Sequence, residues 1–250
     1  SRDHTENILL ENKKSINVKK GKKNIIEIFG RKNLNSINID VPGDPSSAAF
    51  FTTLTLLNNN STLKILNVGL NPTRIGFYEI LKKQGAKIKF DNLKKKNNEL
   101  RGDIIVKSCT LKPLKVSKEY YVKSTDEYPI LFVIAALSHG VSIFRGIADL
   151  VNKESNRIKE MQKILLQIGI KSISKKSELK IFGKGTINVN NNKKIKVPKL
   201  GDHRICMSAF VLGVLTGVYT KINNFETVNT SSPSFLKIMK TLGANFEKTR

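Results

Sequence analysis

Gly43-Asp44-Pro45-Ser46-Ser47 leads into the apolar run 48–57, and this stretch recurs twice in similar form. The second copy joins Asp126-Glu127-Tyr128-Pro129 to the run 130–137, and the third joins Gly201-Asp202-His203-Arg204 to the run 205–215. A helix that is apolar on all sides is buried on all sides. An Asp just before it is placed to cap it and to favour its positive end. The stretches therefore predict three buried helices, each opened by an Asp.

The same elements follow each buried helix in the same order. A strand-like segment comes first, at 63–68, 142–146 and 220–225, and then an amphipathic helix. The apolar stripes are Phe77, Ile80 and Leu81; Ile158, Met161 and Leu165; and Phe235, Met239 and Leu242. Each of these helices ends at a glycine (Gly85, Gly169 and Gly243), and a short strand follows at 86–90, 170–174 and 244–247. From opening Asp to closing Gly the separations are 41, 43 and 41 residues, which indicates a repeated α/β unit.

The first 40 residues resemble the second half of such a unit. Arg2-Asp3-His4-Thr5 is typical of a helix start, and strands are predicted at 15–18 and 25–29. The first helix of the unit and its strand are absent. We therefore expect the natural protein to extend further toward its N-terminus, or this chain to be a fragment of it.

The net charge of +24 raises the question of a polyanionic partner. Only 8 of the 44 basic residues are Arg, the lysines are interspersed with Asn and Ile, and there is no Trp. A surface that reads or stacks bases would need Arg and aromatic side chains interleaved, so nucleic acid is not the expected partner. No run of 18 apolar residues and no signal pattern is present, and we expect a soluble, cytoplasmic protein with no membrane contact. Two cysteines and three histidines give no metal-ligand spacing.

Half of the few arginines stand at predicted helix starts. Helix N-termini attract anions, and equivalent starts in a repeat array gather at one face, where added arginines make a strong phosphate or carboxylate site. The residues are Arg2, Arg74, Arg157 and Arg204. Two carboxylates, Asp126 and Glu154, lie among these cations and could take a proton from a hydroxyl. This pattern predicts a cationic pocket for small polyanions with a carboxylate base, whereas Asp44 and Arg74 are interpreted as structural.

The ordered motifs resemble those of the EPSP synthase family, nearest to its bacterial branch. The resemblance rests on 41–47 (Val-Pro-Gly-Asp-Pro-Ser-Ser), 71–74 (Asn-Pro-Thr-Arg), 126–129 (Asp-Glu-Tyr-Pro), 153–157 (Lys-Glu-Ser-Asn-Arg) and 202–204 (Asp-His-Arg), preceded by 1–6. Any one motif is weak, but the ordered set covers the whole chain and is highly specific.

This resemblance implies an α/β (α+β) fold of βαβαββ-type units, arranged in the two-domain clamp of enolpyruvyl transferases. Residues 1–40 would be the tail of the centrally encoded domain. Residues 41–250 would be most of the other domain, in three repeats at about 41–107, 108–185 and 186–250. We expect one nearly complete domain here, and a monomer for the full-length protein.

The family moves the enolpyruvyl group of phosphoenolpyruvate to the 5-hydroxyl of shikimate 3-phosphate, on the shikimate pathway to chorismate and aromatic amino acids. Phosphate leaves by addition and elimination, and no metal or organic cofactor is needed. By resemblance Asp126 holds the attacking hydroxyl as base, Lys153 lies between the substrates and Glu154 takes part in proton transfer. Arg157 and Arg204 would clamp phosphoenolpyruvate. Arg2 would lie near the phosphate of shikimate 3-phosphate, with Asp126 and Lys153 as further contacts to that substrate.

Three departures from the family pattern affect these expectations. Val151-Asn152 replaces the usual Arg-Val, Asn156 replaces an Asp, and 230–233 (Thr-Ser-Ser-Pro) carries no Lys. The first two remove charge beside Lys153 and Arg157. We expect the isolated chain to be inactive, because phosphoenolpyruvate would meet only part of its clamp. The alternatives are a UDP-N-acetylglucosamine enolpyruvyl transferase, which shares the fold, and a non-catalytic polyanion-binding module.

Overall fold

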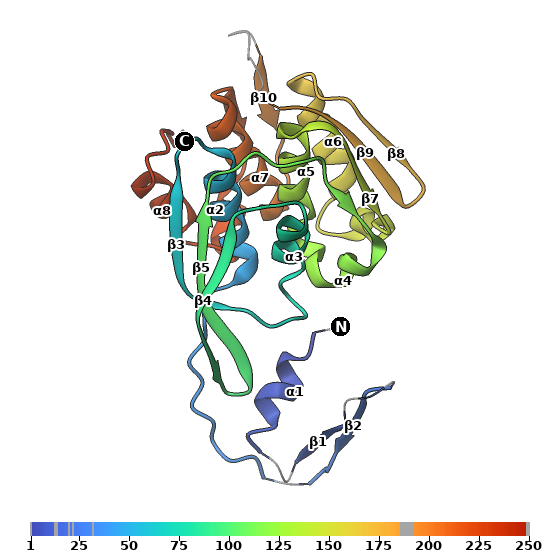
Figure 1. Ribbon diagram of the computed structural model, residues 1–250, viewed down its shortest axis with the longest axis vertical. Coiled ribbons are helices and arrows are strands. Elements are labelled where there is room, and N and C mark those ends of the chain that lie inside the picture. The colour runs from blue at the N-terminus through green and yellow to red at the C-terminus, as the bar shows by residue number, and fades with distance from the viewer. Residues whose placement is uncertain are drawn as a thin grey trace.

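The computed structural model describes residues 2–12, 15–19, 21, 23–31, 33–185 and 193–248. Three nearly apolar helices pack against one another at its centre: α2 (Pro45–Leu57), α5 (Tyr128–Leu137) and α7 (His203–Thr216) (Figure 1). Most of their side chains are buried on every side, as the apolar runs predict. The prediction of three buried helices is therefore confirmed.

Two of the surrounding sheets show how each unit is built. One has the order β3-β5-β4 and the other β6-β7-β9-β8. The strands are β3 (Thr62–Gly69), β4 (Ile88–Lys96), β5 (Glu99–Lys107), β6 (Lys115–Val116), β7 (His139–Arg145), β8 (Ser172–Lys175) and β9 (Glu178–Lys184). In both sheets the strand that follows the buried helix pairs antiparallel with the last strand of a hairpin. The two units thus share one topology, which confirms the repeated α/β fold.

A short parallel pairing joins the two sides of every buried helix. β6 pairs with β7 across α5, and β10 (Lys194–Val197) pairs with β11 (Tyr219–Ile222) across α7. Across α2 the equivalent is a single parallel bridge between Gly43 and Val68. Parallel strands need a crossover connection, and here the buried helix provides it. All three repeats therefore begin with a βαβ crossover.

The second helices cover the outside of this core. They are α3 (Gly76–Lys83), α6 (Arg157–Gln167) and α8 (Phe235–Thr241). The predicted stripes of α3 and α6 are buried, as are Phe235 and Met239 of α8, but Leu242 is 42% exposed and its assignment to a stripe is wrong. Gly85, Gly169 and Gly243 all have φ between 79° and 93°, a left-handed conformation that glycine adopts at little cost.

The strand predicted at 244–247 is wrong. The described residues after α8 form no strand and pair with none. Phe246 instead packs edge-on against Phe210 of α7, with ring centroids 5.4 Å apart. Packing of an aromatic side chain on the core has therefore replaced strand pairing in this segment.

The N-terminal segment lies at the end of the molecule opposite β10 (Figure 1). It comprises α1 (His4–Leu9) and the antiparallel hairpin of β1 (Ile16–Lys19) and β2 (Ile25–Ile28). Asn71 ties α1 to the first repeat through hydrogen bonds to Asp3 at 2.8 Å and Glu99 at 3.0 Å. Among the described helices, none has both the length and the apolar character that crossing a bilayer requires.

Candidate active site

Asp126 lies at the meeting point of three arginines from distant parts of the chain. It belongs to a 3-10 turn, η2 (Thr125–Glu127), directly before α5. Arg2 donates to its Oδ2 at 2.9 Å, Arg157 Nη1 lies 3.7 Å from Oδ1, and Arg204 Nη2 lies 4.0 Å from Oδ2. The fold thus brings together four of the predicted site residues, and three of them stand at helix starts.

The three opening Asp residues do not share one role. Asp44 caps α2 by accepting from the Ser47 N–H at 2.9 Å, and Asp202 caps α7 by accepting from the Arg204 N–H at 3.0 Å. Glu127, not Asp126, is the N-cap residue of α5, and no side-chain hydrogen bond caps that helix. The prediction that Asp126 is a helix cap is therefore wrong: its carboxylate faces guanidinium groups instead.

Arg157 is held in position by a fully buried ion pair. Its side chain is 1% exposed, and its Nε donates to Asp202, which is 0% exposed, at 2.9 Å. Ser155 donates to the same Asp202 oxygen at 2.9 Å, and Glu154 accepts from Arg157 Nη2. A planar guanidinium fixed by carboxylates on two edges has little rotamer freedom left. Its remaining edge is therefore aimed at Asp126.

Two of the arginines around Asp126 keep buried N–H groups without a hydrogen-bond partner. Within the described part of the chain, these include Nη1 of Arg157 and both Nε and Nη1 of Arg204. A buried, charged donor that makes no hydrogen bond is costly, so such groups in a native protein call for a partner such as a bound anion. Because both sets lie beside Asp126, the arrangement provides convergent donors for a carboxylate or phosphate.

Lys153 lies next to this cluster in sequence but points to another partner. Its Nζ is 3.0 Å from Asp149 Oδ2, which also accepts from the Tyr121 hydroxyl at 2.7 Å. Glu154 reaches the cluster only through Arg157. The structure therefore joins Arg2, Asp126, Arg157 and Arg204 directly, Glu154 indirectly, and leaves Lys153 paired with Asp149.

Local electrostatics separate the two neighbouring acids. Burial alone would raise the pKa of Asp126, but the hydrogen bond from Arg2 and the charges of Arg204 and Arg157 hold that pKa below its ordinary value. For Glu127 burial dominates and raises the pKa to about 7. Burial and the charge of Arg204 also lower the pKa of His203, which favours its neutral form. At neutral pH the ionised Asp126 therefore stands next to Glu127, which is close to its titration midpoint.

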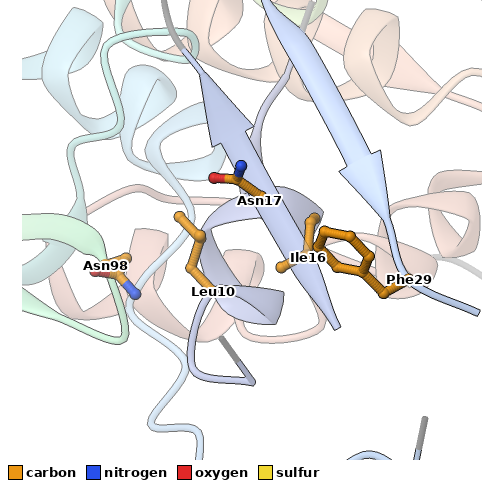
Figure 2. Close-up of a pocket in the computed structure, with 5 residues that line it drawn as sticks. All are labelled: Leu10, Ile16, Asn17, Phe29 and Asn98. Atoms are coloured by element: carbon orange, nitrogen blue, oxygen red, sulfur yellow. The ribbon is translucent and has the colours of Figure 1, made fainter. Parts of the chain in front are cut away.

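Two hollows in the described structure are lined by other residues. The larger, of about 550 Å³, lies between α1, the β1–β2 hairpin and the turn after β4 (Figure 2). It is lined by Leu10, Ile16, Asn17, Phe29 and Asn98, so its walls carry no charged side chain. The second, of about 280 Å³, is lined by residues that include Asp44, Arg74 and Arg101. In the described residues no group of three or more His, Cys, Asp or Glu is arranged to hold a metal ion.

The family model described as EPSP synthase (3-phosphoshikimate 1-carboxyvinyltransferase) matches residues 1–239. The chain belongs to the EPSP synthase family. Curated relatives named 3-phosphoshikimate 1-carboxyvinyltransferase include those of Petrotoga mobilis, 38% identical over 97% of this chain, and Zymomonas mobilis, 37% identical over 99%. In both comparisons the chain covers 55% of the relative, so it spans about half the length of these proteins.

Solved structures agree with this assignment. An EPSP synthase from Acinetobacter baumannii has a TM-score of 0.86 and 34% identity, covering 100% of this chain and 56% of its own. The enolpyruvyl transferase NikO from Streptomyces tendae, with a TM-score of 0.70 and 14% identity over 99% of this chain and 54% of its own, shares the fold. The family and the enolpyruvyl transferase fold expected from the motifs are therefore confirmed.

Two buried acids of the site were not predicted as site residues. Asp202 reads in sequence only as the cap of α7, and its second role becomes visible once Arg157, 45 residues earlier, packs against it. Glu127 follows Asp126 in the motif, but only its burial reveals it as a titrating group. The departure at Asn156 is explained: its side chain caps α6 by accepting from the Lys159 N–H at 3.0 Å, as an Asp would.

Proposed function

We propose that this chain supplies part of the active site of a 3-phosphoshikimate 1-carboxyvinyltransferase. The enzyme would transfer the enolpyruvyl group of phosphoenolpyruvate to the 5-hydroxyl of shikimate 3-phosphate, with release of phosphate. The observation that carries this proposal is the arrangement of Arg2, Arg157 and Arg204 around Asp126, two of them with buried donors left unpaired. The name that the curated relatives carry supports this reaction over that of the nucleotide-sugar enzyme.

The charge balance of the site fits two anionic substrates. Phosphoenolpyruvate and shikimate 3-phosphate each bring phosphate and carboxylate groups, which repel one another until cations neutralise them. Arg157 and Arg204 present fixed donors toward Asp126, and a guanidinium binds carboxylate or phosphate in a bidentate manner. We assign phosphoenolpyruvate to this pair, and the phosphate of shikimate 3-phosphate to Arg2.

Asp126 would hold the attacking hydroxyl and accept its proton. Its carboxylate is hydrogen-bonded to Arg2, which keeps its pKa low and makes it a weak base. A substrate phosphate that draws Arg2 away would remove that hydrogen bond and raise the pKa of Asp126. Binding of shikimate 3-phosphate would thus strengthen the base when its substrate arrives.

Lys153 and Glu154 complete the proposed machinery. Lys153 must leave Asp149 to reach the substrates, and that ion pair is exposed enough to exchange readily. Glu154 could pass a proton to or from the methylene carbon of phosphoenolpyruvate, because its carboxylate is 46% exposed and tethered to Arg157. Overall, the hydroxyl oxygen bonds to C2, the phosphate leaves, and the proton lost from the hydroxyl balances that gained by the product phosphate.

Phosphate release by the product of the complete gene tests this proposal. With phosphoenolpyruvate present, release is expected with shikimate 3-phosphate and not with UDP-N-acetylglucosamine. Asp126→Asn should lower kcat by about 10²–10³-fold, the cost of removing a positioned catalytic group. Asp91→Asn, which breaks an exposed pair with Lys89, is the matched control and should keep full activity. Release with the nucleotide sugar alone would move the protein to the sister enzyme. No release with either would favour a non-catalytic polyanion-binding module.

We also propose a domain boundary after residue 40. Its support is that residues 41–248 contain the three crossover units, whereas α1 and the β1–β2 hairpin lie apart from their common core. The cytoplasmic location and the monomeric state of the full-length protein stay predictions from sequence.

A further inference from the structure

Glu127 occupies the point where the three repeats meet. It is 3% exposed and is the N-cap residue of α5, and it interacts with Ser46 in the first turn of α2 and with Arg204 in the first turn of α7. This acid takes no part in the catalytic scheme proposed above.

The groups around Glu127 connect it to two arginines, Arg74 through Ser46 and Arg204 directly through its charge. From α2 the Ser46 hydroxyl donates to it, and Arg74 in turn donates to Ser46 at 2.8 Å and to Asp44 at 2.7 Å. The charge of Arg204 acts on it from α7, and that of Asp126 from the same turn. The remaining titratable groups that interact with it are the phenols Tyr78 of α3 and Tyr128 of α5.

Two opposing influences leave Glu127 sensitive to charge at the site. Burial favours its neutral form, while the Ser46 hydrogen bond and the charges of Arg204 and Arg74 favour its carboxylate. Their balance places the pKa at about 7, so both forms are populated at neutral pH. Arg204 is the strongest charge acting on Glu127, and its own Nε and Nη1 are buried without a hydrogen-bond partner. An anion on those donors would offset the very charge that keeps Glu127 ionised.

We infer that Glu127 takes up a proton from solvent when a phosphate- or carboxylate-bearing ligand binds to Arg157 and Arg204, and returns that proton when the ligand leaves. This inference rests on the anion site of the proposed function. The protonated acid leaves the charge of Arg204 fully available to the ligand, so Glu127 is a positioning residue that acts through Arg204. By linkage, the affinity for the anion falls as pH rises through the titration of Glu127.

Carbon-13 NMR of the complete gene product, labelled at glutamate Cδ, measures this directly. In the free protein one carboxyl should titrate near pH 7, and its signal should be missing in Glu127→Gln. Adding phosphoenolpyruvate should raise its midpoint by about one unit. The ratio of wild-type to Glu127→Gln affinity for phosphoenolpyruvate should then fall about fivefold between pH 6 and pH 8, because a one-unit shift reaches its tenfold limit only over a wider pH range. Taking the ratio at each pH cancels the ionisation of the ligand itself.

Two further variants make the test independent of the folding of Glu127→Gln. Asp126→Asn keeps Glu127 and should lower its midpoint, because it removes a neighbouring negative charge. Glu178→Gln, which breaks a sheet-surface pair with Arg145, should leave the midpoint and the affinity ratio unchanged. A midpoint near the ordinary value of 4.5, or one that stays fixed while calorimetry detects binding, would refute the inference and leave the proposed function intact. If phosphoenolpyruvate binds neither alone nor with shikimate 3-phosphate, both fall together.

Discussion

Two Asp residues at equivalent places in the repeat should respond very differently to the same change. Asp44 and Asp202 both cap a buried helix, and both accept from an arginine, Arg74 at 2.7 Å and Arg157 at 2.9 Å. They differ in burial, because the Asp44 side chain is 39% exposed and that of Asp202 is 0% exposed. Replacing either by Asn keeps the shape and the cap but removes the charge.

The expected loss in free energy of unfolding depends on whether the arginine that loses its counter-ion is exposed or buried. Asp44→Asn weakens an exposed pair, worth about 0–1 kcal/mol, while Asn caps as well as Asp. Asp202→Asn leaves Arg157, 1% exposed, without its main counter-ion and places an amide against its Nε–H, a loss of about 3–5 kcal/mol. We therefore expect the two free energies of unfolding to differ by at least about 2 kcal/mol.

Urea unfolding followed by far-UV circular dichroism is the suitable assay, since the chain has no Trp. Linear extrapolation gives both free energies of unfolding on the same scale. Equal losses in the two variants would refute the reasoning, because burial would then not decide the cost. A large loss in Asp44→Asn alone would show that the exposed pair of Asp44 with Arg74 contributes more than the buried pair of Asp202 with Arg157.

Three other changes test separate features. Glu127→Gln should flatten the pH dependence of the free energy of unfolding. The folded-state pKa of Glu127 is about 7, above the ordinary 4.5, so the wild type should lose about 3 kcal/mol of stability as pH rises between these values. Urea titrations of both proteins at pH 5 and pH 8 measure this difference. Gly183→Ala should cost about 3 kcal/mol, because its Cβ would collide with backbone oxygens at the end of α5, whereas Gly201→Ala, in open space, should change the urea midpoint little. Asp149→Asn should release Lys153 and lower KM for phosphoenolpyruvate by at most about fivefold with kcat nearly unchanged; an unchanged KM in steady-state kinetics would contradict a resting role for that pair.

The fold could be predicted largely because its signals are local. An all-apolar run such as 130–137 has few alternatives to a central helix, and the glycines at 85, 169 and 243 mark helix ends by backbone geometry alone. The strand expected at 244–247 failed because a strand depends on a partner elsewhere in the chain, and Phe246 found a better contact in the core.

The candidate site could be predicted only in outline. The repeat predicts that the helix starts carrying arginines gather at one face. It does not predict which acid pairs with each arginine, because those contacts join residues far apart in sequence. Asp126 is 124 residues from Arg2, with which it pairs. The pairing of Lys153 with Asp149 likewise depends on a 3-10 turn, η3 (Ala148–Asn152), which places Asp149 beside Lys153 and within reach of Tyr121, 28 residues earlier. No residue pattern shows such an arrangement.

Of the three equivalent residues Asp44, Asp126 and Asp202, only Asp126 faces the arginine cluster. The reason is that the arginine of the second repeat pairs with the Asp of the next repeat and not with that of its own. In the first repeat Arg74 pairs with Asp44, the cap of its own unit. In the second, Arg157 stands at the matching place but pairs with Asp202 of the next unit at 2.9 Å, and it stays 3.7 Å from its own Asp126. Asp126 is therefore neither a cap nor closely paired within its repeat, and Arg2 becomes its hydrogen-bond partner. An arginine from outside the three repeats could be displaced by a ligand without breaking any of them, and this is why we propose this carboxylate, and not Asp44 or Asp202, as the base.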